Sequence, residues 1–332
     1  MSPAPVTSRG VPARGTVVRV HAHAKINLDL RVLGTRPDGY HELRTVFQTL
    51  ALHDTLDCVA REGPLAIECD TPGVPVDRTN LIWRAAETLW RALRRDGPAA
   101  GVLVRLQKRI PVQGGLGGGS ADAAAALLAL ARVWRTPVRR EQLVEVAAAI
   151  GADVAFCLSG GTALGLGRGD EVYPLMDLPR HWVVLLVPGF GISSTDAYGW
   201  YDAERGLDRG ALPPEPQHVP GPWPSRAAQM INDLEAPIAR RHPEIARMKG
   251  ALRQAGALAA AMSGSGSTVF GLFQRRGEAV SAMGRLGGAG WQVLLTESIG
   301  RTVYARRTAP RRLKGTAPRR LSLARSRKSQ LH

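Results

Sequence analysis

A glycine-rich segment at residues 114–119 constrains this chain more than any other stretch. Five of its six residues are glycine, and it runs directly into the Ala- and Leu-rich residues 123–131. Glycine has no Cβ, so main-chain N–H groups can approach a ligand closely. A helix that starts behind such a loop adds unpaired N–H groups and a partial positive charge. The pattern predicts a phosphate-binding loop at a helix start; the alternative, a flexible surface turn, is disfavoured by the apolar flanks.

Two common phosphate-binding patterns do not fit this segment. The P-loop places a Lys directly after its last glycine, but Ser120 stands at that position here. The dinucleotide-binding pattern needs a third glycine where this chain again has Ser120. A glycine loop without a Lys of its own must obtain positive charge from elsewhere in the fold.

Length and composition are those of an ordinary globular protein. The 332 residues are enough for two modest domains, and the 44% hydrophobic and 22% charged content is typical of soluble proteins. Cys58, Cys69 and Cys157 are an odd number without metal-like spacing, which indicates reduced thiols and a cytoplasmic location. Residues 1–15 lack the apolar core of a secretory signal, and we expect them to be a disordered leader.

The formal net charge of +16 is concentrated at one end of the chain. Residues 306–332 contribute +10 and contain no acidic residue, which leaves +6 for the rest. We expect residues 306–332 to be a basic disordered tail, with weak binding to RNA or an anionic surface as its potential role. The mildly basic remainder suits an anionic substrate.

Hydrophobic periodicity predicts an α+β fold with two mixed layers and a boundary near residues 175–181. Asn80 is a candidate helix cap, and the Pro- and Gly-rich residues 207–224 predict an internal loop. The predicted strands are 17–20, 24–33, 47–52, 55–59, 102–110 and 182–187, with a strand–turn–strand unit at 259–273 and further strands over 291–304. The predicted helices are 81–93, 120–134, 141–150, 232–255 and 278–286.

An early predicted strand carries Lys25 and Asn27 on one face, because side chains alternate along a strand and Ile26 lies between them. A Lys among apolar residues needs a partner or a ligand. Read from the residues alone, an exposed Lys on an edge strand is an equally good interpretation.

Asp153 follows the helix-stopping Gly151 inside an apolar run. A half-buried carboxylate in such a place is usually paired or functional. The alternative is an Asx-turn residue that only satisfies a loop, and the residues alone do not separate the two interpretations.

Two further turns carry polar or aromatic groups. Tyr40 and His41 follow an Asp-Gly turn, where they are placed to stack on and hydrogen-bond a base. Residues 262–270 form a Ser/Gly turn whose hydroxyl and N–H groups are placed to close over phosphates. Each also has a plain structural interpretation as an ordinary turn.

Five segments, in this order, resemble the 4-diphosphocytidyl-2-C-methyl-D-erythritol kinase family of the GHMP kinases. They are A-K-I-N-L (24–28), P-D-G-Y-H-E-L (37–43), P-V-Q-G-G-L-G-G-G-S-A-D-A-A (111–124), G-A-D-V (151–154) and M-S-G-S-G-S-T-V-F (262–270). The resemblance extends over residues 17–304. It implies a two-domain GHMP kinase fold. The N-terminal ribosomal-protein-S5-like α/β domain would cover 16–178, and a ferredoxin-like α+β domain would cover 179–305.

The resemblance also implies the reaction and its catalytic residues. The family transfers the γ-phosphoryl group of ATP to the 2-hydroxyl of its substrate in the non-mevalonate isoprenoid pathway. Asp153 would accept the hydroxyl proton as general base, and Lys25 would stabilise Asp153 and the developing charge. Ser120 is the candidate contact for Mg²⁺, the expected metal. The residues implied in wrapping the ATP phosphates are Pro111, Val112, Gln113, Gly114, Gly115, Leu116, Gly117, Gly118, Gly119, Ser120 and Ala121.

The acceptor substrate carries a cytidine diphosphate group, and the resemblance assigns residues to it. Asn27 would hold the polyol, Tyr40 would stack on the cytosine, and His41 would hydrogen-bond to it. Tyr198 is the candidate for a second stacking aromatic. We expect no membrane partner, and either a monomer or a homodimer.

Two other functions remain open. Another GHMP kinase, acting on mevalonate, homoserine or a sugar, is disfavoured by Tyr40 and His41, since those substrates have no base to stack on. A nucleic-acid-binding protein would explain the basic residues 306–332, but they contain no interleaved aromatic residues.

Overall fold

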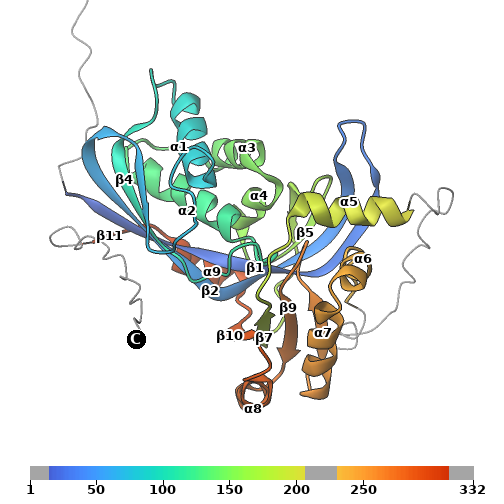
Figure 1. Cartoon of the computed structure of the whole chain (residues 1–332). Coiled ribbons are helices and arrows are strands. Elements are labelled where there is room, and N and C mark those ends of the chain that lie inside the picture. Colours follow the sequence, from blue (N-terminus) through green and yellow to red (C-terminus); the bar gives the residue numbers. More distant parts are fainter. Residues whose placement is uncertain (1–14, 206–229, 314–332) are drawn as a thin grey trace, which may run out of the picture.

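The computed structural model describes residues 15–205 and 230–313 (Figure 1). Residues 1–14 of the leader predicted at 1–15, the predicted loop at 207–224 and the basic residues from 314 onward therefore lie outside the described residues. Over the part of the chain that is described, no helix has the length and apolar character needed to cross a membrane.

Two sheets organise the described residues. The larger has seven strands in the order β11-β1-β2-β4-β3, and β5 pairs with β2 and β6. Its longest strands, β1 (Val17–Thr35) and β2 (His41–Pro64), form one antiparallel hairpin. The other strands are β3 (Ala66–Cys69), β4 (Ala100–Gln107), β5 (Thr162–Leu166), β6 (Glu171–Pro174) and β11 (Arg311–Leu313).

The prediction of separate short strands along this hairpin is wrong. Residues 17–20 and 24–33 belong to one strand, β1, and residues 47–52 and 55–59 belong to β2. Register shifts at His23/Lys25 and Asn27/Asp29 interrupt the pairing pattern without ending the strands. Such bulges alter the side-chain alternation that a sequence pattern relies on.

Helices α1 to α4 cover one face of the larger sheet (Figure 1). Small side chains let α2 pack closely against its neighbours, with Ala123, Ala126 and Ala129 completely buried. Asn80 caps α1 as expected, because its side chain accepts a hydrogen bond from the Ile82 N–H at 2.9 Å. The helices are α1 (Leu81–Ala92), α2 (Gly118–Val133), α3 (Arg140–Ile150) and α4 (Ala152–Ser159).

The second sheet is antiparallel, with the order β10-β7-β9-β8. Numbered along the chain within this sheet, that order is 4-1-3-2, the ferredoxin-like arrangement expected for the C-terminal domain. Helices α7 and α8 pack on it (Figure 1). Its elements are β7 (Trp182–Val187), α5 (Ser194–Arg205), α6 (Glu235–Arg241), α7 (Glu244–Gln254), β8 (Ala259–Met262), β9 (Val269–Phe273), α8 (Arg276–Leu286) and β10 (Gln292–Glu297).

The single helix predicted over 232–255 is two helices, α6 and α7. His242 leaves the helical conformation at φ −127° and ψ 80°, and Pro243 follows it. Proline disfavours the helical conformation in the residue before it, so the break lies where the apolar period alone does not show it.

One apolar cluster joins the two sheets. Ala24, Ile26 and Leu28 on β1 pack against residues of β7, β8 and β9, among them Leu185 and Phe270. Because these residues alternate with Lys25 and Asn27, the opposite side of the same stretch is free to build a polar site. The predicted alternation along A-K-I-N-L is confirmed.

The chain returns to the larger sheet after β10. Helix α9 (Arg301–Thr308) packs on β1, and β11 pairs with Val17–Arg19 of that strand. The prediction of strands over 291–304 is therefore wrong from Arg301 onward, and the tail predicted from Arg306 is wrong for residues 306–313. Tertiary contacts decide this: the Arg301 N–H donates to Asp177 at 2.6 Å at the start of α9.

Candidate active site

The glycine segment connects β4 to α2 and lies directly on Lys25. The Lys25 N–H donates to the Leu116 carbonyl at 3.0 Å. Gly117 precedes α2 with φ +68°, and a Cβ at that position would lie 2.8 Å from Cγ of Lys25. No side chain caps α2, and its first residues, Gly118 to Ser120, line the cavity, which fits a phosphate site. Position 117 therefore requires glycine for two reasons: its φ is positive, and the Lys25 side chain occupies the space that a Cβ would need.

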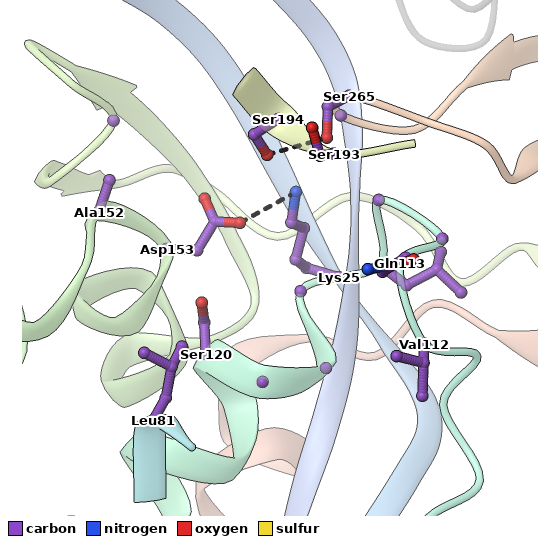
Figure 2. A pocket seen from close by; sticks show the side chains of 18 of the residues that line it. Lys25, Leu81, Val112, Gln113, Ser120, Ala152, Asp153, Ser193, Ser194 and Ser265 are labelled. Atoms are coloured by element: carbon purple, nitrogen blue, oxygen red, sulfur yellow. Dashed lines mark hydrogen bonds and ion pairs between the residues drawn. The ribbon is translucent and has the colours of Figure 1, made fainter. Parts of the chain in front are cut away.

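Lys25 and Asp153 form an ion pair beside this loop. Nζ of Lys25 lies 3.2 Å from Oδ2 of Asp153 and donates to Asn27 Oδ1 at 2.7 Å. The Lys25 side chain is 5% exposed and that of Asp153 is 31% exposed. Figure 2 shows Lys25, Asp153 and Ser120 pointing into the same space from β1, α4 and α2. The carboxylate is held by a cation on one side and opens to a ligand on the other.

Asp153 lies in the first turn of α4, not in a loop. Gly151 precedes the helix in an extended conformation, and α4 begins at Ala152. The partial positive charge at a helix N-terminus stabilises a carboxylate there. The placement of Asp153 follows from the helix stop at Gly151 and the helix start directly after it.

Asn27 connects the pair to the sheet. Its Nδ2 donates to Oγ1 of Thr45 at 2.7 Å, and that hydroxyl donates to the Asp29 carbonyl at 2.7 Å. All of these groups are buried or nearly so. The chain of hydrogen bonds fixes the Asn27 amide, and with it the position of the Lys25 ammonium.

A cavity of about 790 Å³ extends from the glycine segment to the tip of the β1–β2 hairpin. It is lined by residues of β1 and β2, of α1, α2, α4 and α5, and of the turn between β8 and β9. The predicted site residues that line it are Lys25, Asn27, Tyr40, Asp153, Tyr198 and all ten residues from Pro111 to Ser120. Two predicted residues, His41 and Ala121, are not part of the lining.

Three ring-bearing residues, Tyr40, His41 and Tyr198, lie at the aromatic end of the cavity. Tyr40 is 58% exposed, while Tyr198 is half-buried and stacks on His41 with ring centroids 4.6 Å apart. His41 Nε2 also lies 2.8 Å from Oδ1 of Asp202. Burial raises the pKa of Tyr198, so this ring stays neutral. The structure brings Tyr40, His41 and Tyr198 to one end of the cavity, with His41 behind Tyr198.

Arg168 is a cavity residue that the sequence interpretation did not assign. Its guanidinium lies 5.1 Å from the centre of the Tyr40 ring and donates to Asp170 Oδ2 at 2.6 Å. Arg168 lies in the glycine-rich residues 160–170, which were the available signal. A cation beside an exposed aromatic ring favours an anionic ligand that also carries a flat group.

The Ser/Gly turn, which connects β8 to β9 of the second sheet, packs against the glycine segment. Ser263 Oγ donates to the Gly115 carbonyl at 3.0 Å, and the Thr268 N–H donates to the Gly114 carbonyl at 3.2 Å. Ser265 and Ser194 hydroxyls lie 3.1 Å apart at the cavity wall (Figure 2). The turn therefore supports the loop from outside and contributes Ser265 to the lining.

Beneath the loop lies a charged group that the sequence interpretation missed. Lys108 Nζ lies between Asp54 and Asp122, at 2.5 Å and 2.7 Å from their Oδ2 atoms. Burial raises the pKa of Asp122, whose Oδ1 has no hydrogen-bond partner. Burial lowers the pKa of Lys108, but the two carboxylates outweigh it and the net change is upward.

Within residues 15–205 and 230–313, no group of three or more His, Cys, Asp or Glu side chains has the arrangement of a metal site. Magnesium is commonly held by one or two protein oxygens together with substrate phosphates and waters, so a phosphate cavity does not require such a group. Ser120 lines the cavity at the start of α2, a position that fits this donor chemistry.

Family models match both parts of the chain. The model described as GHMP kinases N terminal domain matches residues 80–161, and the one described as GHMP kinases C terminal matches residues 223–290. The N-terminal match contains the glycine segment and Asp153.

Curated relatives agree over most of the chain. The 4-diphosphocytidyl-2-C-methyl-D-erythritol kinase of Anaeromyxobacter dehalogenans is 44% identical over 294 residues, which are 84% of this chain and 90% of the relative. The enzyme of the same name from Pelotomaculum thermopropionicum is 43% identical over 260 residues, or 77% and 89%.

Solved structures confirm the α+β GHMP kinase fold. A crystal structure of 4-(cytidine 5'-diphospho)-2C-methyl-D-erythritol kinase aligns with TM-score 0.68 and 33% identity, covering 85% of this chain and 99% of that one. The homoserine kinase of Cytophaga hutchinsonii aligns with TM-score 0.62 at 18% identity, covering 94% and 100%, and shows the fold alone. From the curated relatives, the family models and the fold together, the chain belongs to the 4-diphosphocytidyl-2-C-methyl-D-erythritol kinase family of the GHMP kinases.

Proposed function

We propose that this chain transfers the γ-phosphoryl group of ATP to the 2-hydroxyl of 4-diphosphocytidyl-2-C-methyl-D-erythritol, giving the 2-phosphate and ADP. One observation carries the proposal beyond family membership. The Lys25–Asp153 pair lies in a single cavity with a main-chain phosphate loop at one end and the Tyr40 and Tyr198 rings at the other.

The glycine segment supplies the phosphate end. Its main-chain N–H groups and the start of α2 favour negative charge, and the cation that the loop lacks comes from Lys25. Phosphoryl transfer depends on positioning and charge neutralisation more than on covalent chemistry. The contact of Lys25 with Leu116 and Gly117 places its ammonium where such charge develops.

Asp153 is the proposed general base. Its Oδ2 is held by Lys25, and its partly exposed carboxylate is placed to accept the proton of a hydroxyl group in the cavity. Asn27, which lines the same wall, would hold the polyol of the acceptor. Together these groups align one hydroxyl for in-line attack and take its proton as the bond to phosphorus forms.

The aromatic end would bind the cytidine diphosphate group. Tyr40 offers an exposed ring for stacking, and Arg168 beside it offers a cation for the diphosphate. Stacking orients Tyr198 on His41, and His41 is in turn held by Asp202. A hydrogen bond from His41 to the base stays a prediction, since His41 does not line the cavity.

ATP is the proposed phosphoryl donor and Mg²⁺ the proposed metal. The cradle formed by Gly117 and the uncapped start of α2 fits a phosphate group, and Ser120 is the residue that would contribute an oxygen to the metal. Bound Mg²⁺ neutralises phosphate charge in such reactions.

The test is ADP release by the purified full chain with Mg-ATP and four acceptors: the cytidyl alcohol, mevalonate, homoserine and galactose. Turnover confined to the cytidyl alcohol is the expected result. Turnover with a different alcohol would keep the Lys25/Asp153 assignment and reject the base-binding roles of Tyr40 and Tyr198. Absence of turnover with all four would reject the proposed reaction and move attention to the basic residues 306–332.

A further inference from the structure

We propose that Asp54 is a positioning residue that fixes both ends of the ATP-phosphate loop, acting through Lys108 and through two main-chain N–H groups. The inference rests on the proposed function, because it assigns a role relative to ATP. Asp54 does not line the cavity and is completely buried, so any effect on ATP passes through its neighbours.

Asp54 holds the near end of the loop. Thr55 on β2 is the residue opposite Gln107, the last residue of β4. Asp54 therefore lies one position beyond the end of the β2–β4 pairing. Its Oδ1 accepts from the N–H groups of Arg109 and Ile110, at 2.5 Å and 2.8 Å. These N–H groups lie where the chain leaves the sheet, directly before Pro111. A buried carboxylate that replaces ladder partners fixes the direction in which the loop departs.

Lys108 carries the same restraint to the far end of the loop. Its ammonium bonds Asp54 Oδ2 and reaches Asp122 Oδ2, which belongs to the second turn of α2. A Cβ at Gly118 would lie 3.3 Å from Nζ of Lys108. The ammonium therefore lies directly against the first residue of α2, and Asp54 is connected to the loop before residue 111 and after residue 117.

The three charged groups form a buried unit. The Asp54 and Lys108 side chains are 0% and 6% exposed, and Asp122 is 5% exposed. Replacing one carboxylate removes one of the two buried partners of the Lys108 ammonium, which costs stability. A loss of stability is expected for a purely structural unit as well, so stability does not separate the two roles. The discriminating quantity is the affinity for ATP relative to that for the acceptor.

The experiment compares Asp54→Asn with a matched control, Asp57→Asn. Both carboxylates are buried on β2, but Asp57 forms a two-bond ion pair with Arg19, at 2.7 Å for each bond, and does not line the cavity. We expect Asp54→Asn to raise the KM for ATP about tenfold or more, with the KM for the acceptor within about twofold of the wild type. Asp57→Asn should leave both KM values unchanged while lowering the unfolding temperature.

Calorimetric titration with ADP provides a readout that does not depend on the acceptor. Weaker ADP binding by Asp54→Asn than by Asp57→Asn supports the inference. Equal ADP affinity in folded Asp54→Asn and wild type overturns it, as do KM values for ATP and acceptor that rise in parallel in both variants. A wild-type chain that binds ADP but does not phosphorylate the cytidyl alcohol contradicts the proposed acceptor alone and leaves the ADP comparison valid.

A second variant covers the case in which Asp54→Asn does not fold. Asp122→Ala frees the far end of the loop from Lys108, and we expect faster hydrogen exchange of the backbone amides at residues 112–119 together with weaker ADP binding. Unchanged exchange and unchanged ADP affinity in Asp122→Ala would overturn the inference.

Discussion

The two ends of the cavity are built in different ways. At the phosphate end, Lys25 has its ammonium held by Asn27 and Asp153, its side chain against Gly117, and its N–H on the loop. At the aromatic end, Tyr40 stands 58% exposed on a hairpin tip, with a single cation over its ring. The phosphate end has its cation fixed in place, as the proposed transfer would require, while the aromatic end is open, as the proposed entry and exit of an acceptor would require.

The largest expected effect tests the phosphate end. Asp153→Asn removes the proposed base and should lower kcat by about 10²- to 10⁴-fold, since that is the usual contribution of a general base. ADP affinity, measured by calorimetry, should stay within about twofold of the wild type. Asp96→Asn, an exposed carboxylate outside the cavity lining, is the control. A kcat within about tenfold of wild type in Asp153→Asn would remove the base assignment.

Gly117→Ala asks how tightly the phosphate end is packed. The added Cβ would meet Lys25 at 2.8 Å, at a backbone φ of +68° that disfavours any side chain. Gly256→Ala has the same kind of backbone, φ +89°, with open space around it, so it measures the backbone cost alone. We expect kcat/KM for ATP to fall about tenfold or more in Gly117→Ala and to be nearly unchanged in Gly256→Ala. Equal decreases of kcat/KM for ATP in the two variants would show that the close contact with Lys25 does not contribute to activity.

Tyr40→Ala tests the open end. Loss of base stacking costs about 1–3 kcal/mol, which predicts a KM for the cytidyl acceptor raised about 5- to 150-fold. The KM for ATP should not change, because Tyr40 lies at the other end of the cavity. Tyr173→Ala, a 50% exposed tyrosine outside the lining, is the matched control. Steady-state kinetics with each substrate varied in turn would reject the proposal if both KM values moved together.

The smallest expected effect concerns the scaffold behind the phosphate end. Burial, followed by the nearby His53, lowers the pKa of His23 from 6.5 to about 3. The fold therefore holds the neutral ring, and its contribution to stability is complete above pH 6.5 and lost as the pH falls toward 3. The slope in this window is at most about 1.4 kcal/mol per pH unit. Urea unfolding at pH 7.5 and 5.5 should show a smaller pH dependence in His23→Gln; an equal dependence would contradict the assignment.

The sequence predicts the phosphate end better than the aromatic end, for a physical reason. Lys25 and Asn27 follow from strand alternation, and the glycine segment follows from local backbone chemistry, so neighbours in sequence carry the signal. Tyr198 was named from the family resemblance alone. Arg168 was missed because it reaches the aromatic end only through the packing of distant elements. Asp54 was missed for the same reason, since it meets Lys108 across 54 positions of the chain.

The elements of the fold also differ in how well the sequence predicts them. The longer apolar-periodic elements, such as α1, α2 and β4, were predicted, whereas α4 and α5 were not among the predicted helices. The break between α6 and α7 depends on one proline. Helix α9 was not predictable, because the contact that starts it comes from Asp177. A local sequence pattern does not indicate a contact between residues that lie so far apart in the chain.

The return of β11 to β1 has a consequence for synthesis of the protein. The Arg312 side chain donates to the Thr16 hydroxyl across 296 positions of the chain. At about 5–20 residues per second, a ribosome delivers that partner roughly 15–60 s after Thr16. Tyr304, which follows the same route, packs on Gly160 and donates to the Cys157 carbonyl of α4, the helix that carries Asp153. In the nascent chain α4 therefore lacks this support until the ribosome has passed Tyr304, more than 140 residues after the helix itself, and we expect α4 to become fully ordered only then.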